Sequence, residues 1–176
     1  DLARFAPFAG KRAGADGSDP DRPVMILSVG RAVPKKGFDV LLEALALLPR
    51  NINWRFEHVG GGDLLPALKA EAERLGIADR ITWTGSLAQQ DVLDRYRGAD
   101  LFALACRIGA DGDRDGLPNV LVEASSQRLA CVSTNISGVP ELIRDGDNGL
   151  LVSPEDPPAL AAALERAIRD PELREM

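Results

Sequence analysis

Apolar residues in this chain fall into short continuous runs that alternate with longer runs of helical spacing. The short runs are typical of strands buried on both faces, and apolar positions that recur every three or four residues are typical of amphipathic helices. The predicted strands cover residues 24–29, 53–59, 80–84, 100–105, 130–134 and 149–152, and the predicted helices cover residues 38–48, 64–75, 89–96, 119–127 and 157–168. This alternation predicts an α/β domain, a doubly wound, Rossmann-like, six-stranded parallel sheet with helices on both faces.

The order of the strands decides where a ligand site lies. In the common doubly wound order 3-2-1-4-5-6, the first and fourth strands are neighbours, and the crevice at their carboxyl ends binds the ligand. This order, which we assume at this point, brings together the loop at residues 30–37 and the loop that contains Asp115. We therefore expect these two loops to form one site.

Composition narrows the classes of function. Residues 1–22 lack periodicity and are typical of a linker or tail, so we expect the folded domain to span residues 23–176. We also expect the chain to be a fragment of a longer protein. With 45% hydrophobic and 27% charged residues, no apolar run of membrane length and no signal segment, the sequence predicts a cytoplasmic protein. A formal net charge of -6 disfavours a nucleic-acid partner, which normally requires a basic stripe.

The loop after the fourth predicted strand holds the strongest candidate chemistry. The turn Gly-Leu-Pro-Asn at residues 116–119 opens a helix, and Pro118 is predicted at the first helical position, where its missing N–H is no loss. The amides of Asn119 and Val120 would then point outward at the positive end of the helix dipole. Such a helix end is an anion site, most simply a phosphate site.

Two carboxylates flank that turn. Asp115 precedes it, and Glu123 lies roughly one helical turn further on. Both could accept hydrogen bonds from sugar hydroxyls on either side of a bound phosphate.

The loop Gly30–Gly37 supplies positive charge from the opposite side of the predicted crevice. Arg31 and Lys36 suit a diphosphate, because a guanidinium binds phosphate oxygens in a planar, bidentate manner and an ammonium adds a mobile point charge. On its own, a basic turn is common on protein surfaces. The facing helix end is what favours the functional interpretation.

The glycine run Val59–Asp63 follows the second predicted strand and suggests a dinucleotide fingerprint. The fingerprint fails, because Leu65 stands where a third glycine is required. A turn at Gly60 that lets a ligand approach the backbone closely and a simple tight turn remain equally good interpretations.

Other candidate groups favour structural interpretations. His58, the one histidine, is expected to pack with its strand neighbours, so no Ser/His/Asp arrangement is available. The acidic row of Asp111, Asp113 and Asp115 resembles half of a calcium loop but lacks the distal Glu, so we expect no metal. Cys106 and Cys131 are too few and too far apart for a metal cage or disulfide framework, and we expect small buried thiols.

Taken together, three motifs resemble the C-terminal half of the group 1 family of retaining nucleotide-sugar glycosyltransferases, which have the GT-B fold. These motifs are the loop 30–37, the pair Asp115 and Glu123 at an E-x7-E spacing, and the segment 137–152, which begins Ser-Gly-Val-Pro-Glu. The resemblance covers residues 24–168. One departure is visible: the first acid of the pair is usually Glu, and Asp115 has a shorter reach to the sugar ring.

The resemblance implies roles for individual residues. Arg31 and Lys36 would hold the donor diphosphate, Glu123 the ribose hydroxyls, and Asp115, with the turn that follows it, the donor sugar and its phosphate. We accordingly assign catalytic roles to Asp115, Arg31 and Lys36. The residues assigned to donor binding are Gly30, Gly60, Gly116, Leu117, Asn119, Val120 and Glu123.

The resemblance also implies partners. The nucleotide-diphosphate sugar is a substrate, so no cofactor is expected. The acceptor, a sugar or lipid-linked glycan, would bind an N-terminal domain that this sequence lacks, and the whole protein would work in the cytoplasm, at times at the inner face of the membrane. Two other hypotheses for the function of this chain stay open. It could be a nucleotide-diphosphate-binding module without chemistry of its own, or a doubly wound oxidoreductase, which the failed fingerprint disfavours.

Overall fold

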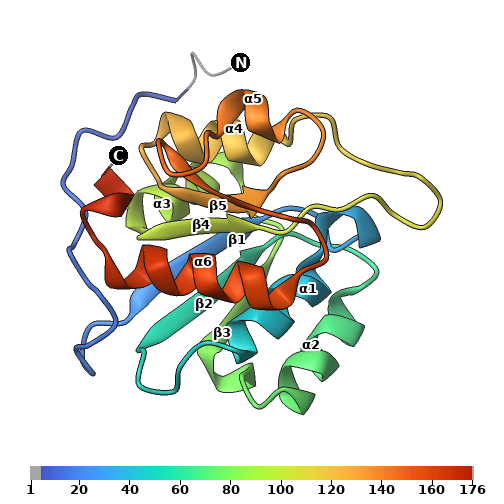
Figure 1. The fold of residues 1–176 in the computed structure, drawn as a ribbon, viewed down its shortest axis with the longest axis horizontal. Coiled ribbons are helices and arrows are strands. Elements are labelled where there is room, and N and C mark those ends of the chain that lie inside the picture. The colour runs from blue at the N-terminus through green and yellow to red at the C-terminus, as the bar shows by residue number, and fades with distance from the viewer. Residues whose placement is uncertain (1–4, 176) are drawn as a thin grey trace.

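The computed structural model describes residues 5–175, which form one parallel sheet flanked by helices (Figure 1). The strands are β1 (Val24–Val29), β2 (Trp54–Val59), β3 (Ile81–Gly85), β4 (Leu101–Leu104), β5 (Cys131–Thr134) and β6 (Gly149–Val152). The helices are α1 (Phe38–Ala46), α2 (Leu65–Arg74), α3 (Gln89–Gly98), α4 (Asn119–Ser126), α5 (Val139–Leu142) and α6 (Pro157–Arg169), and short 3-10 helices lie at Pro34–Lys36, Ala78–Arg80 and Leu173–Glu175.

The strand order confirms the predicted topology. Within the described residues the sheet has the order β3-β2-β1-β4-β5-β6, and every pairing is parallel. Every residue of the central strand β4 is buried, as is every residue of β5, because helices cover both faces of the sheet. The chain crosses from one side of β1 to the other between β3 and β4, so the loops after β1 and β4 lie side by side at the carboxyl edge.

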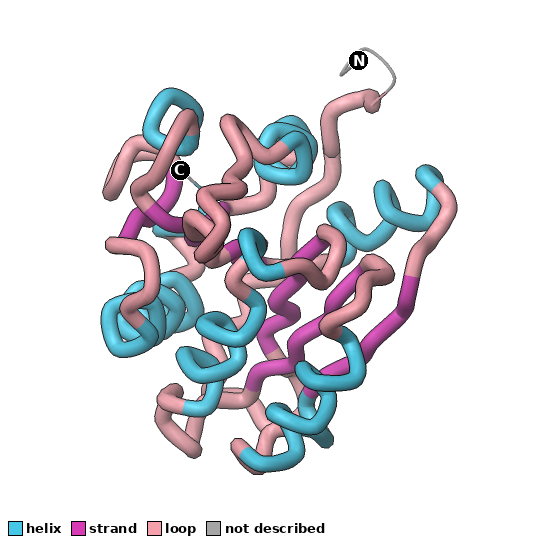
Figure 2. The backbone as a smooth tube through the Cα atoms, turned by 90° about the vertical axis from the view of Figure 1, so that its right-hand side faces the viewer, coloured by secondary structure: helices cyan, strands magenta, loops and turns pink. Residues whose placement is uncertain are grey.

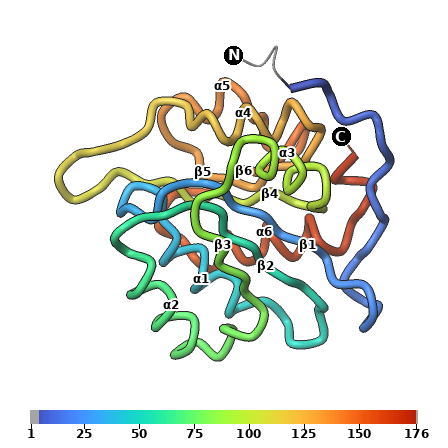
Figure 3. Tube along the Cα trace, turned by 180° about the vertical axis from the view of Figure 1, so that it is seen from behind, coloured from blue at the N-terminus to red at the C-terminus, as the bar shows by residue number. Residues whose placement is uncertain are grey.

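Helices occupy two layers. α1 contacts both α2 and α6 on one face of the sheet, and α3 and α4 pack on the opposite face, which Figure 3 shows from behind (Figures 1 and 3). Figure 2, turned by 90°, shows the strands enclosed between these two layers. α1 is buried over most of its surface, because it packs against β4, α2 and α6; its buried residues are Phe38, Val40, Leu41, Leu42, Ala44 and Leu45. None of the described helices is long and apolar enough to cross a membrane.

One local prediction was wrong, and one short helix was missed. Pro118 is not the first helical residue but the N-cap of α4, with φ -61° and ψ 125°. The ring of proline restricts φ, and this φ value suits both a helix and extended chain, so the sequence could not distinguish the two positions. The short helix α5 was not predicted, because its four residues are too few for a periodic pattern.

The N-terminal segment, predicted as a linker, forms neither helix nor strand in residues 5–22 and runs along one side of the domain (Figure 1). The guanidinium of Arg12 fastens it there. This group donates hydrogen bonds to the main-chain oxygens of Tyr96 (3.1 Å), Ala99 (2.5 Å) and Gln127 (2.6 Å), near the C-terminal ends of α3 and α4. One side chain thus satisfies carbonyl groups that helix ends leave without partners.

Candidate functional site

The loops after β1 and β4 meet as predicted. The amide of Arg107 donates a hydrogen bond of 2.9 Å to the main-chain oxygen of Lys35, which joins the two loops directly. Gly37 allows this approach: its φ is +65°, and a Cβ there would lie 1.8 Å from the carbonyl oxygen of Ala105. Both its backbone conformation and its neighbour require glycine.

Lysines from the first loop face an aspartate from the second. Nζ of Lys36 lies 2.6 Å from Oδ2 of Asp115, and Nζ of Lys35 lies 3.4 Å from Oδ1 of the same carboxylate and 3.5 Å from Oδ2 of Asp113. Partial burial by itself raises the pKa of Asp115, but the hydrogen bond and charge of Lys36, with the charge of Lys35, outweigh it and leave the pKa below its usual value. Asp115 is therefore ionised at neutral pH.

This pairing shows what sequence reasoning did not see. We expected Lys36 and Asp115 in one site, but not that both carboxylate oxygens of Asp115 would be occupied by lysines, one of them Lys35. Arg31 lies at the start of the same loop and is exposed. Among the described residues it forms no ion pair with Asp115 or Glu123, so the structure brings only the lysines of this loop to the acidic residues.

The N-terminus of α4 forms the wall beside Asp115. Pro118 makes no side-chain cap, and no acidic residue stands in the first turn. The amide of Leu121 donates to the oxygen of Pro118 (3.1 Å), whereas no acceptor within the described residues receives the amides of Asn119 and Val120. These two N–H groups and the helix dipole give the wall a positive potential.

The loop after β5 closes the site from a third side. The amide of Gly138 donates to the oxygen of Gly116 (2.8 Å), and a Cβ at Gly138 would lie 3.2 Å from both that oxygen and Cβ of Leu117. The small residues of this loop thus lie against the predicted phosphate-binding turn. Around them is an open depression of ≈ 580 Å³, lined by Ile108, Arg114, Asp115, Gly116, Ile136 and Ser137.

Glu123 lies on α4 and receives a hydrogen bond that was not predicted. The phenol of Tyr96, at the C-terminal end of α3, donates to Oε2 of Glu123 at 2.9 Å. Burial, and then the nearby carboxylate of Glu123, raise the pKa of Tyr96 far above its usual value, so the phenol remains an O–H donor. The sequence carried one signal for this contact, because a buried tyrosine hydroxyl needs a polar partner.

The glycine turn after β2 packs against the loop after β1. The amide of Ala32 donates to the oxygen of Gly61 (2.8 Å), and a Cβ at Gly60 would lie 2.2 Å from the oxygen of Gly30. This close backbone neighbour explains the glycine, so the packing interpretation is sufficient; a donor-binding role for Gly60 stays a prediction. His58 is packed as expected, with Nε2 2.9 Å from the same Gly30 oxygen, and burial lowers its pKa.

The two cysteines are buried, and the acidic row is held by contacts with its neighbours. Cys106 and Cys131 are buried as predicted, and burial raises the pKa of each thiol to about 12, so neither is a thiolate at neutral pH. In the acidic row, Oδ1 of Asp111 accepts the amide of Asp113 at 2.9 Å. Asp113 and Asp115 pair with Lys35 and Lys36, and the absence of a metal from this row stays a prediction.

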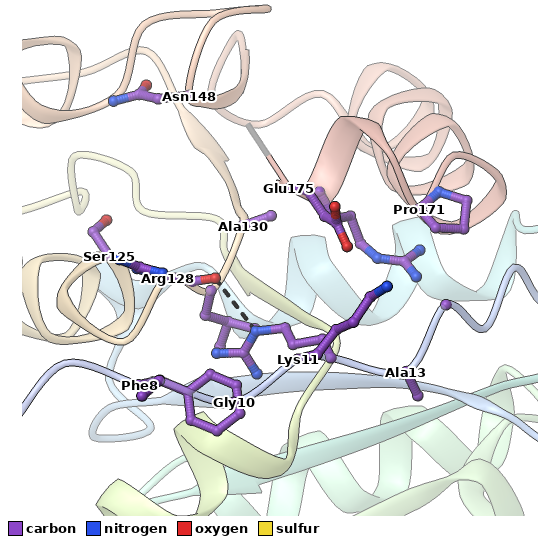
Figure 4. A pocket seen from close by; sticks show the side chains of 15 residues that line it. Phe8, Gly10, Lys11, Ala13, Ser125, Arg128, Ala130, Asn148, Pro171 and Glu175 are labelled. Atoms are coloured by element: carbon purple, nitrogen blue, oxygen red, sulfur yellow. Dashed lines mark hydrogen bonds between the residues drawn. The ribbon is translucent and has the colours of Figure 1, made fainter.

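A larger depression, of ≈ 640 Å³, lies at the opposite, amino edge of the sheet (Figure 4). It is lined by residues 8–14, Ser125, residues 128–130, Asn148, Pro171, Arg174 and Glu175. Its two most buried cations already have partners: Arg12 donates to helix-end carbonyls, and Arg174 donates to the oxygens of Ala167 and Ala15. The carboxyl edge, where lysines and free amides converge, is therefore the better candidate for an anionic ligand.

Comparisons with known proteins agree with this fold. Residues 15–176 match the family described as glycosyl transferases group 1. The chain therefore belongs to the group 1 glycosyltransferase family. A relative, the GDP-mannose-dependent alpha-(1-6)-phosphatidylinositol monomannoside mannosyltransferase of Mycolicibacterium smegmatis, is 35% identical over 175 residues, which cover 97% of this chain and 46% of the relative. The chain thus spans less than half the length of this relative.

Solved structures share the fold. Sucrose-phosphate synthase from Thermosynechococcus elongatus superposes with a TM-score of 0.81 at 23% identity, over 99% of this chain and 43% of that protein. Anabaena HepE, in a complex with UDP and glucose, superposes with a TM-score of 0.76 at 24% identity, over 87% of this chain and 41% of HepE. WaaG, a glycosyltransferase involved in lipopolysaccharide biosynthesis, superposes with a TM-score of 0.77 at 25% identity, over 90% of this chain and 41% of WaaG. At these identities the likeness concerns the fold, and it confirms the predicted Rossmann-like half of a GT-B glycosyltransferase.

Proposed function

We propose that this domain binds the diphosphate of a nucleotide-sugar donor at the carboxyl edge of the sheet. The observation that carries the proposal is the pairing of Lys36 and Lys35 with Asp115, directly before the uncapped N-terminus of α4. Cationic side chains and unpaired amides then face a diphosphate from two loops, which is the arrangement that phosphate recognition requires.

Asp115 pairs with the same ammonium group, that of Lys36, which we assign to the diphosphate. Its carboxylate lies 2.6 Å from Nζ of Lys36, so an entering diphosphate must exchange places with it on the ammonium group. A diphosphate offers more negative charge and more acceptor oxygens than one carboxylate, which favours the exchange. Asp115, once released, accepts hydroxyl hydrogen bonds from the donor sugar, within the shorter reach of an aspartate.

The whole protein, of which this chain is the donor-binding half, transfers a hexose to an acceptor hydroxyl with retention at the anomeric carbon. Negative charge grows on the leaving diphosphate in the transition state, where Lys36, Arg31 and the amides of α4 stabilise it more strongly than in the ground state. Asp115 and Glu123 position the donor and are not the acid and base of a hydrolase. No cofactor takes part in this scheme.

The acceptor binds an N-terminal domain outside this chain. We propose a glycan or lipid-linked acceptor, because the Mycolicibacterium smegmatis relative is named for transfer to a phosphatidylinositol mannoside. Such an acceptor places the enzyme in the cytoplasm, peripheral to the inner face of the membrane.

Calorimetric titration of the chain with GDP, UDP, ADP and NAD tests the proposal. We expect one nucleoside diphosphate to bind and the double variant Arg31→Ala/Lys36→Ala to lose that binding. Preferential binding of NAD would instead support an oxidoreductase and refute the donor site.

Turnover separates the enzyme from a binding module. We expect the full-length protein to transfer sugar and this chain to bind the donor nucleotide without turnover. A full-length protein that binds the nucleotide sugar but forms no product with glycan acceptors would be a binding module.

A further inference from the structure

Tyr96 is held in place from three directions. It is the one tyrosine of the sequence, and its side chain is 1% exposed. Its ring lies 5.9 Å from the ring of Phe102 on β4, its main-chain oxygen accepts a hydrogen bond from Arg12, and its hydroxyl donates to Oε2 of Glu123 at 2.9 Å. The phenol therefore reaches Glu123 from a rigid position in the core.

Glu123 needs such a support. It is half-buried on α4, and within the described residues the phenol of Tyr96 is the side-chain donor to its carboxylate. A glutamate side chain otherwise has several rotamers, and fixing one of them upon ligand binding costs conformational entropy. One hydrogen bond to Oε2 holds the rotamer and leaves Oε1 to accept further hydrogen bonds.

We propose that Tyr96 is a positioning residue, which orients the carboxylate of Glu123 to accept hydrogen bonds from the ribose hydroxyls of the donor nucleotide. This inference rests on the proposed function, in which Glu123 contacts the ribose. Packing alone does not account for the tyrosine, because a phenylalanine would fill nearly the same volume without placing a hydroxyl that requires a partner in the core.

Tyr96→Phe removes the hydroxyl and keeps the ring. The test compares the Kd of the nucleoside diphosphate that the wild-type chain binds with the Kd of its 2′,3′-dideoxy counterpart. We expect the variant to bind the ribonucleotide about fivefold to tenfold more weakly, because the free side chain of Glu123 must then be ordered upon binding, and to bind the dideoxy compound as wild type does. In a Glu123→Ala background, Tyr96→Phe should have no further effect on either Kd.

Phe102→Leu is the matched control. It disturbs the packing of the same ring without touching the hydroxyl, so any loss of affinity should be equal for the two nucleotides. If Tyr96→Phe also weakens both nucleotides equally, the role of Tyr96 is merely structural and the inference is wrong. If the wild-type chain binds none of GDP, UDP and ADP, the proposed function fails first, and the role of Tyr96 with it.

A second measurement tests the hydrogen bond without any nucleotide. Because the sequence has one tyrosine, labelling with ζ-13C tyrosine gives a single phenol resonance. We expect Glu123→Ala to shift this resonance while Glu141→Ala, at an exposed position on α5, leaves it unchanged. A resonance that is the same in Glu123→Ala and wild type would refute the contact and the inference that depends on it.

Discussion

Replacement of Lys36 by methionine separates the ion pair that the structure gives to this side chain from the diphosphate binding that we propose for it. Its ammonium group lies 2.6 Å from Asp115, with side-chain exposures of 13% and 20%. Because both groups are partly screened from water and Lys35 still neutralises Asp115 from 3.4 Å, the free energy of unfolding should fall by only about 1 kcal/mol. Thermal denaturation of the two proteins measures this difference.

The effect on ligand binding should be larger. Loss of one charge-assisted hydrogen bond to a diphosphate costs about 2 kcal/mol, which weakens the affinity for the nucleoside diphosphate about 30-fold by calorimetry. Lys11→Met is the matched control, because it removes the same charge at the opposite edge of the sheet, where Lys11 lines the larger depression (Figure 4). Equal affinities of wild type, Lys36→Met and Lys11→Met for the nucleoside diphosphate would refute the assignment of the diphosphate to the site at Lys36.

Three further predictions concern stability. Gly37→Ala should lower the free energy of unfolding by about 3 kcal/mol or more, because φ is +65° and the new Cβ would meet the main-chain oxygen of Ala105. The control is Gly76→Ala, where φ is +74° but the surrounding space is open, so the loss should be only about 1 kcal/mol. Chemical denaturation measures both differences. The lowered pKa of Asp115 means that its ion pairs stabilise the fold above the ordinary aspartate pKa and are lost as the pH falls through the lowered value. Asp115→Asn should therefore be less stable than wild type at pH 7, and in pH-dependent melting this difference should shrink as the pH falls through the lowered pKa of Asp115. Asp156→Ala should cost about 1 kcal/mol, because Oδ1 of Asp156 caps α6 at the amide of Ala159, and an unchanged melting temperature would contradict this.

Much of the fold follows from periodicity. Strands such as β4 are uninterrupted apolar runs, and together with intervening helices they define a parallel sheet whose common order places the loops after β1 and β4 together. That long-range step relied on topology, not on any local signal. It succeeded because right-handed crossovers leave few orders for alternating strands and helices.

Side-chain partners were harder to predict. The pairing of both lysines with Asp115 depends on where flexible side chains end, and sequence spacing carries no such information between segments from different loops. The contact of Tyr96 with Glu123 joins two helices, and no spacing within either helix indicates which residue of the other it meets. Short elements such as α5 also stay hidden, because one turn contains less than one period of a pattern.

The attachment of Arg12 has a mechanical consequence. Its guanidinium ties the segment 5–22 to the ends of α3 and α4, and these helices carry Tyr96 and Glu123. A pull on that segment must either break these hydrogen bonds or shift both helices as a unit. A displacement of the N-terminal segment would thereby reach the carboxylate of Glu123 through the two helices to which Arg12 is bound.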